Sequence, residues 1–135
     1  MEPIELLERL RQAVDDHDIE SVVGCFAPDY RNETPCHPGR GFHGSEQVRT
    51  NWTRIFAGVP DVSATILRTA VDGEVVWSEW EMRGTRPDGA PHHLQGIIVF
   101  GVQGGVFTWA RFYLEPVDPG DGGVDAAIGQ IVGGT

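Results

Sequence analysis

The chain has 135 residues, of which 40% are hydrophobic and 22% are charged, and its 10 basic against 20 acidic residues give a formal net charge of −10. This length favours one globular domain with a substantial core. The negative charge argues against nucleic acid, which needs a basic surface, and against anionic membranes.

The start of the chain and its cysteines indicate a reduced, cytoplasmic protein. The first residues, MEPIELLERLRQ, are charged throughout and lack the apolar core of a secretion signal. Cys25 and Cys36 form no CxxC pair and no zinc spacing, and no carboxylate is placed to complete a metal site with His92 and His93. Phosphate-loop and dinucleotide-binding motifs are absent. We therefore expect neither a metal nor a cofactor.

Three amphipathic helices are predicted in the first 60 residues, each from an apolar stripe at helical spacing. The first covers residues 4–16, with the stripe Ile4, Leu7, Leu10, Ala13 and Val14. Asp18 can cap a second, short helix with the stripe Ile19, Val22, Val23 and Phe26. Ser45 can cap a third, which Gly58 and Pro60 end and whose stripe is Val48, Trp52, Ile55 and Phe56.

Four β-strands are predicted after residue 61, where the hydrophobic period changes from 3.6 to 2. They span residues 62–71, 74–85, 91–102 and 106–117, and the turns Asp72-Gly73, Pro87-Asp88-Gly89 and Gly104-Gly105 each suit a hairpin. The sequence thus predicts an α+β domain over residues 1–117, with three N-terminal helices packed on a curved antiparallel sheet. The Gly- and Asp-rich residues 118–135 read as a frayed tail or as a strap across a partner subunit.

Residues 26–44, FAPDYRNETPCHPGRGFHG, hold the first group of candidate catalytic side chains. Tyr30 and Asn32 share one face of an extended segment, where they can orient a carbonyl, a hydroxyl or a water, or can bond to nearby backbone. His37 is the candidate proton carrier, because imidazole titrates near neutral pH and Pro38 stiffens its loop. Its alternative role is that of an exposed loop histidine.

The strand faces predict where a ligand would lie. In residues 78–83, Trp80 and Met82 point to one side while Glu79 and Glu81 point to the other. With the apolar side concave, the expected ligand-binding residues are Trp52, Phe56, Trp80, Met82, Ile98 and Phe112. The opposite arrangement would make Glu79, Glu81 and Arg111 an acid–base set. We favour salt bridges on the outer sheet face or a dimer contact for those three charges, since unpaired charges inside an apolar cavity are costly.

The order of elements resembles the nuclear transport factor 2-like (NTF2-like) cone, and within it the SnoaL-like branch of polyketide cyclases, ketosteroid isomerases and limonene-type epoxide hydrolases. Its markers are FAPDY at 26–30, GFHG at 41–44 and QGGVFTWARFYLE at 103–115. The resemblance covers about residues 4–117. It implies a bent sheet and helices around a deep, mostly apolar pocket, with an outer sheet face that often forms a homodimer.

The catalytic positions of these families are only partly present. Tyr30-Arg31-Asn32 is similar to the Tyr-x-Asn that holds a nucleophilic water in the epoxide hydrolases. Trp80 and Met82 stand where the arginine and the first aspartate of that set belong. Phe112 stands at the second aspartate, which is also the acid–base position of the SnoaL cyclases. The acidic pair of the steroid isomerases has no clear match.

Two hypotheses follow for a small lipophilic molecule held in the cone. The first is an isomerase, cyclase or hydrolase of specialised metabolism that works without metal or cofactor, in which His37 or a glutamate moves a proton while Tyr30 and Asn32 orient a substrate oxygen. The second is a non-catalytic ligand-binding or dimerisation module. The missing strand acids favour the module, and the tyrosine–asparagine pair with His37 favours the enzyme.

Overall fold

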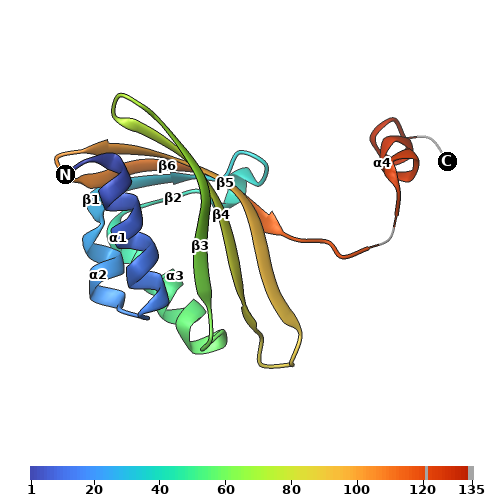
Figure 1. The fold of residues 1–135 in the computed structure, drawn as a ribbon, viewed down its shortest axis with the longest axis horizontal. Helices are drawn as coiled ribbons and strands as arrows, with labels where there is room; N and C mark the ends of the chain where they lie inside the picture. The colour runs from blue at the N-terminus through green and yellow to red at the C-terminus, as the bar shows by residue number, and fades with distance from the viewer. Residues whose placement is uncertain (121, 134–135) are drawn as a thin grey trace.

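The structure is a computed structural model that describes residues 1–120 and 122–133 (Figure 1). The helices are α1 (Pro3–Asp15), α2 (Ile19–Gly24), α3 (Ser45–Gly58) and α4 (Val124–Ile131), with a 3-10 turn, η1, at Pro38–Arg40. The strands are β1 (Phe26–Glu33), β2 (Phe42–His43), β3 (Ser63–Asp72), β4 (Val75–Thr85), β5 (Pro91–Gln103) and β6 (Val106–Pro116). The three predicted helices and four predicted strands are confirmed to within a few residues at each end.

The first two helices begin and end for simple reasons. Pro3 occupies the first turn of α1, where its missing N–H costs nothing. The Asp18 carboxylate caps α2 by accepting the backbone N–H of Ser21 at 3.2 Å, as the sequence predicted. Ile4 was expected on the buried stripe of α1, but its side chain is 41% exposed, and Leu6 is buried instead.

Two local predictions were wrong. Phe26 was assigned to the second helix, yet α2 ends at Gly24 and Phe26 opens β1. The backbone explains this, because the Cys25 carbonyl accepts the N–H of Phe107 at 2.8 Å and so begins the pairing with β6. Ser45 is the first residue of α3, and the capping position belongs to Gly44, whose φ of 93° suits glycine.

The six strands form one sheet in the order β2-β1-β6-β5-β4-β3. The predicted antiparallel meander β3-β4-β5-β6 is confirmed, and the added strand β1 runs parallel to β6. Pairing shifts by one or more residues within β1·β6, β3·β4 and β5·β6, and such bulges increase the bend and twist of strands. Gly96 lies where an added Cβ would meet the Tyr113 carbonyl, so the closest approach of β5 to β6 depends on glycine.

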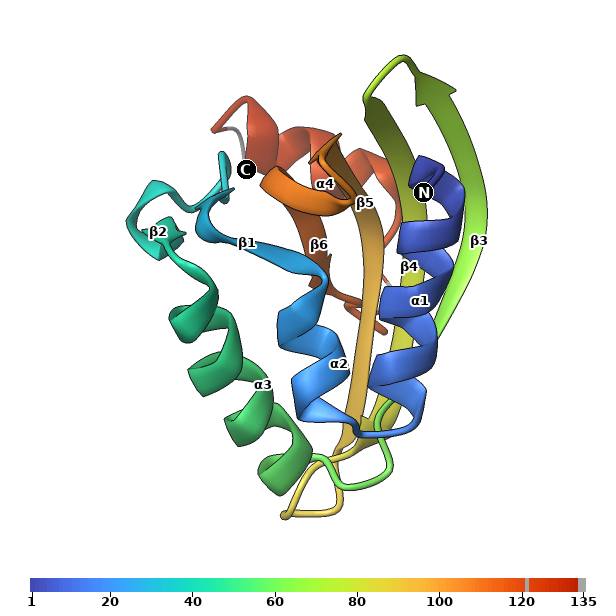
Figure 2. The same ribbon diagram turned by 90° about the vertical axis from the view of Figure 1, so that its left-hand side faces the viewer.

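Helices α1, α2 and α3 cover the concave side of the sheet (Figures 1 and 2), with α1 against β3 and β4 and α3 against β1. The core lies between these layers and contains the apolar faces of α1 and α2 together with inward side chains of the strands, including Trp80, Phe100, Phe107 and Ala110. Helices on one side of a curved, open sheet are the α+β arrangement that the sequence resemblance implied.

Helix α4 lies beyond the end of β6 and away from the helical layer (Figure 1). Val124, Ile128, Ile131 and Val132 are all more than half exposed. The described part of residues 118–135, which were expected to form a frayed tail or a strap across a partner subunit, therefore includes a short helix with exposed apolar side chains. Within the described residues, no helix is long and apolar enough to cross a membrane.

Candidate functional site

A cavity of about 290 Å³ lies between α3 and the concave face of the sheet. Its wall is mostly apolar and comes from α3, β1, β2, β4, β5 and β6, with the side chains Phe26, Phe42, Val48, Trp52, Ile55, Met82, Leu94, Phe112 and Leu114. The polar lining consists of Tyr30, Asn32, Thr34, Arg40, Asn51 and His92. We call this cavity the concave pocket. None of the carboxylates in the described residues lines it, although the chain carries 20 acidic residues.

The six expected ligand-binding residues divide into three groups. Trp52, Met82 and Phe112 line the concave pocket. Trp80 and Ile98 instead line an adjoining void of about 20 Å³, which is closed by core side chains and shares several walls with the pocket. Phe56 lies outside both, and its ring stacks on His17 with centroids 4.7 Å apart.

Tyr30 and Asn32 lie side by side on β1 and face the concave pocket. The Tyr30 hydroxyl donates to Asn32 Oδ1 at 2.8 Å, and the two side chains are only 1% and 7% exposed. Burial raises the pKa of the Tyr30 phenol far above its usual range, so it stays neutral. Among the described residues, nothing accepts a hydrogen bond from the Asn32 amide nitrogen, and no fully buried polar atom lacks a partner. The Asn32 N–H donors are therefore open to the cavity.

His37 does not join this pair. It precedes η1 and its Nε2 lies 2.8 Å from Glu115 Oε1 on β6, with about two-fifths of each side chain exposed. It is not part of the pocket wall. The sequence placed His37 beside Tyr30 and Asn32 by proximity along the chain, whereas its partner is 78 residues away.

His92 is the pocket histidine that sequence reasoning passed over. It is partly buried, and this burial lowers its pKa below the ordinary 6.5, with a further lowering by Arg86 and an opposing effect of Asp61. Strand alternation in the sequence could have identified it. Counting back along β5 from the inward Ile98 in steps of two gives Gly96, Leu94 and His92. The adjacent His93 faces the other way.

The alternative set of Glu79, Glu81 and Arg111 lies on the outer face of the sheet. Glu81 bonds to His93 at 2.9 Å and to Arg83 at 3.1 Å, and the hydrogen bond from His93 is the main reason that its pKa is lowered. Arg68 lies 3.8 Å from Glu79, and Arg111 lies 3.9 Å from Glu33. These charges form the outer salt-bridge network that the strand pattern favoured.

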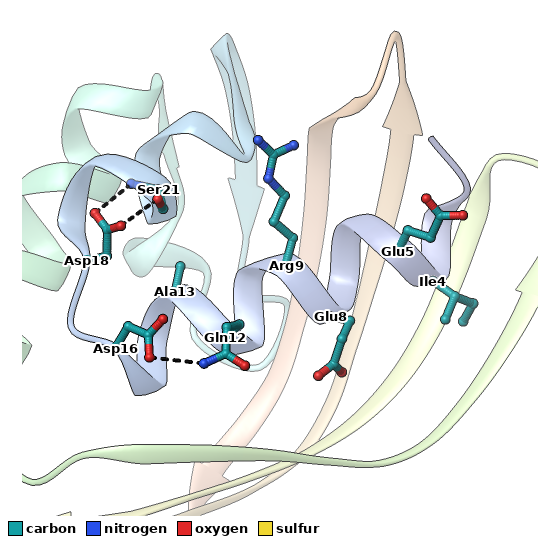
Figure 3. A pocket seen from close by; sticks show the side chains of 9 residues that line it. All are labelled: Ile4, Glu5, Glu8, Arg9, Gln12, Ala13, Asp16, Asp18 and Ser21. Atoms are coloured by element: carbon teal, nitrogen blue, oxygen red, sulfur yellow. Dashed lines mark hydrogen bonds between the residues drawn. The ribbon is translucent and has the colours of Figure 1, made fainter.

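A larger groove of about 630 Å³ runs along α1 to the start of α2 (Figure 3). Two pairs of its polar side chains bond to each other, Gln12 to Asp16 at 3.0 Å and Ser21 to Asp18 at 2.7 Å. The side chains of Glu5 and Arg9 rise on one side of α1, whereas that of Glu8 points to the other side (Figure 3). Despite its volume, this open groove gathers no convergent polar groups, so the concave pocket is the candidate site. The part of the chain that the structure describes holds no cluster of three His, Cys, Asp or Glu suited to a metal ion.

The sequence matches the SnoaL-like domain family over residues 7–110. No curated protein sequence matches the chain at a significant level. Among solved structures, IdmH, a candidate polyketide cyclase from Streptomyces antibioticus, is similar at 22% identity and a TM-score of 0.73, over 84% of this chain and 92% of IdmH.

Two other similar structures contain ligands. A Catenulispora acidiphila protein with a ketosteroid isomerase-like fold, in complex with trimethylamine, is 19% identical over 84% of this chain and 87% of its own, with a TM-score of 0.71. A Mycobacterium tuberculosis protein in complex with estradiol-17β-hemisuccinate is 19% identical over 82% of this chain and 91% of its own, with a TM-score of 0.70. At these identities the likeness shows the fold.

Proposed function

The chain belongs to the SnoaL-like domain family, and from that premise we propose that it binds a small lipophilic molecule in the concave pocket and converts it by acid–base isomerisation, cyclisation or hydration. The observation that carries the proposal is an open amide donor in an apolar cavity. Asn32 is almost fully buried, Tyr30 holds its oxygen, and its N–H groups face the space that a ligand would fill.

The size and lining of the pocket define the ligand. Ligand cavities commonly measure roughly 300–1,000 Å³, so a cavity of about 290 Å³ suits a small one- or two-ring molecule. Its body would contact Trp52, Met82 and Phe112, and a carbonyl or hydroxyl oxygen would accept from Asn32. The steroid ester bound by the Mycobacterium tuberculosis protein is larger, but it supports a lipophilic ligand for this fold.

Binding is tested by a thermal-shift screen with lipophilic ketones, epoxides and aromatic polyketide-like compounds. At least one class should raise the unfolding temperature of the wild-type protein. Leu114→Trp, which fills the pocket, should abolish that shift, whereas Tyr113→Trp on the opposite face of the same strand should retain it. A screen without any shift, or a shift that survives Leu114→Trp, would contradict the proposal.

The second candidate function is a binding module without catalysis. It is favoured because no carboxylate of the described residues lines the pocket. Trp80, Met82 and Phe112 occupy the positions where the enzymes that the sequence resembles carry acids or an arginine. Turnover separates the two functions. Chromatography and proton NMR of the extracted small molecule before and after incubation should detect a product if the protein is an enzyme, and the unchanged ligand if it is a module.

We also propose that a second copy covers the outer face of the sheet. Trp77 is 51% exposed there, Tyr113 and Leu67 are also exposed, and a shallow hollow lies among Trp77, Glu79 and Ile97. Light scattering should report a dimer for the wild-type protein and a monomer for Trp77→Glu. A wild-type monomer would contradict this part of the proposal without affecting the pocket.

A further inference from the structure

The concave pocket offers a ligand more hydrogen-bond donors than acceptors. Asn32 Oδ1 accepts the Tyr30 hydroxyl at 2.8 Å, and Asn51 Oδ1 accepts from Gln47 Nε2 at 2.8 Å. Both asparagines line the pocket, so the group that each has left for a ligand is its amide nitrogen, which donates. The Arg40 guanidinium also lines the pocket and can only donate. A ligand group that only accepts hydrogen bonds matches this lining best.

Arg40 brings a permanent positive charge to the described wall of the pocket, and no carboxylate of the described residues pairs with it. All 10 basic residues of the chain are arginines. Those that pair with a carboxylate are Arg11, Arg49, Arg68, Arg83, Arg86 and Arg111. Arg9, Arg31 and Arg54 also have no such partner among the described residues, but they lie outside the pocket wall. Arg40 is therefore the cation that an anionic ligand in this pocket can use.

The backbone brings Arg40 close to Asn32. Strand β2 pairs Phe42 with Asn32, so Arg40, two residues before Phe42, lies near the end of β1. A Cβ added at Gly41 would lie 3.2 Å from the Asn32 carbonyl oxygen, so the chain after η1 runs directly against β1. Thr34, two residues after Asn32, lines the same cavity with its hydroxyl-bearing side chain. The cation and two neutral donors therefore share one end of the pocket.

The wall of the pocket divides by burial into an apolar interior and a polar mouth. Phe26, Val48 and Met82 are at most 7% exposed, whereas Arg40 is exposed and Asn51 is partly exposed. An ion pair at the mouth keeps part of its hydration, which avoids the large cost of burying charge in the apolar interior. The pocket thus suits a molecule with an apolar body and one anionic end.

We infer that the ligand of the concave pocket is a small lipophilic carboxylate, and that Arg40 is the residue that selects it. This inference rests on the proposed function and names its substrate class. The guanidinium forms an ion pair with the carboxylate, while the Asn32 amide donates to the same end of the ligand. A one- or two-ring body contacts Trp52, Met82 and Phe112. One guanidinium balances the single charge of a carboxylate, whereas a phosphate monoester brings a charge of about −1.5 to −2.

The test compares two probes with the same bicyclic skeleton. One is 1,2,3,4-tetrahydro-2-naphthoate, a carboxylate, and the other is 2-tetralone, an uncharged ketone. Isothermal titration calorimetry near neutral pH measures both dissociation constants. The wild-type protein should bind the carboxylate roughly 10-fold or more tightly than the ketone, because hydrogen bonds to a charged group are the stronger ones.

Three variants assign that preference to one side chain. Arg40→Gln should weaken carboxylate binding roughly 10- to 100-fold and change the affinity for 2-tetralone by less than about 2-fold. Arg40→Lys keeps the charge but loses the planar fork, so it should retain part of the preference. Arg54→Gln on α3 is the matched control, since it removes an arginine that also has no carboxylate partner among the described residues and lies outside the pocket wall. It should leave both affinities unchanged.

The two probes separate failure of this inference from failure of the proposed function. Binding of 2-tetralone as tightly as the carboxylate, or a preference that survives Arg40→Gln, overturns the inference and leaves the proposed function intact. An equal loss of carboxylate affinity in Arg40→Gln and Arg54→Gln would show that only the overall charge matters, and it also overturns the inference. If neither probe binds, the inference fails, and the proposed function fails with it when the thermal-shift screen is blank as well.

Discussion

The two faces of strand β4 differ in burial and in charge. Toward the helices, Trp80 is 1% exposed and its indole N–H donates to Ser78 Oγ at 2.8 Å, so that even the polar atom is satisfied inside the core. Toward the outside, Glu79 and Glu81 pair with Arg68, Arg83 and His93. Alternate residues of one strand thus form a buried, mostly apolar face and an exposed, charged face.

This difference indicates which parts of the fold supply polar side chains to the concave pocket. The centre of the sheet supplies the pocket with apolar surface only. The groups able to handle a ligand come from its margins, namely Tyr30 and Asn32 on β1, Arg40 in η1, Asn51 on α3 and His92 at the start of β5. Charged residues on the outer face are already matched and are not available to the ligand.

The largest expected effect on stability comes from Trp80→Ala, and Trp77→Ala on the other face of β4 is its control. Trp80→Ala removes a fully buried side chain and should cost about 3–5 kcal/mol of unfolding free energy. Trp77→Ala, on the half-exposed outer face, should cost less than about 1 kcal/mol for the monomer. Urea denaturation measures both, and equal losses would contradict the assignment of inner and outer faces.

Tyr30→Phe should have the next largest effect. It leaves Asn32 Oδ1 buried without its donor, a loss of roughly 1–3 kcal/mol. The double variant Tyr30→Phe/Asn32→Leu removes both partners and should recover part of that stability. Its affinity for any ligand that accepts a hydrogen bond from the Asn32 amide should fall. A double variant less stable than the sum of its single changes would argue against a coupled pair.

A smaller effect is expected from pH. Because the folded pKa of His92 is lowered, the unfolded chain takes up this proton at a higher pH than the folded chain does. The contribution of His92 to stability is complete above about pH 6.5 and is lost as the pH falls through the folded pKa. His92→Gln should therefore flatten the decline in melting temperature below pH 6.5.

Other lowered pKa values act in a separate pH range. The carboxylates of Asp61 and Glu81 have ordinary pKa values of 3.8 and 4.5, both lowered in the fold, so their contributions are lost only in that more acidic range. A pH dependence just below pH 6.5 that is identical in wild type and His92→Gln would show that burial does not perturb the pKa of this histidine.

The smallest expected effect lies in the outer salt bridges. Arg68 is 88% exposed at its side chain and lies 3.8 Å from Glu79, so Arg68→Ala should change stability by at most about 0.5 kcal/mol. The same change should leave ligand binding untouched. A large loss of stability or of ligand binding would mean that the Arg68–Glu79 pair contributes more than an exposed ion pair does.

Local patterns were sufficient for most of the fold. The strand ends follow from Gly73, Gly89 and the Gly104-Gly105 pair, whose positive φ angles make the hairpin turns, and strand alternation correctly separated Trp80 from Glu79. The misplaced Phe26 shows the limit of such patterns. Its apolar spacing continues the second helix, and only pairing with Phe107, some 80 residues away, makes it a strand residue.

The site was less predictable for the same reason. Tyr30 and Asn32 share a face because they are two residues apart, which sequence can show. The pairing of His37 with Glu115 depends on where η1 meets β6, which sequence cannot show. Strand alternation showed that His92 and His93 cannot share a face, but it could not show which of the two faces the pocket.

The account rests on a ligand whose oxygen is held by the Asn32 amide inside the concave pocket. Titration of ¹⁵N-labelled protein with 2-tetralone, followed by two-dimensional NMR, tests this directly. We predict that the Asn32 side-chain amide and the Trp52 indole shift along one binding curve while the Trp77 indole on the outer face stays fixed. Binding that moves Trp77 and leaves Asn32 unchanged would contradict it.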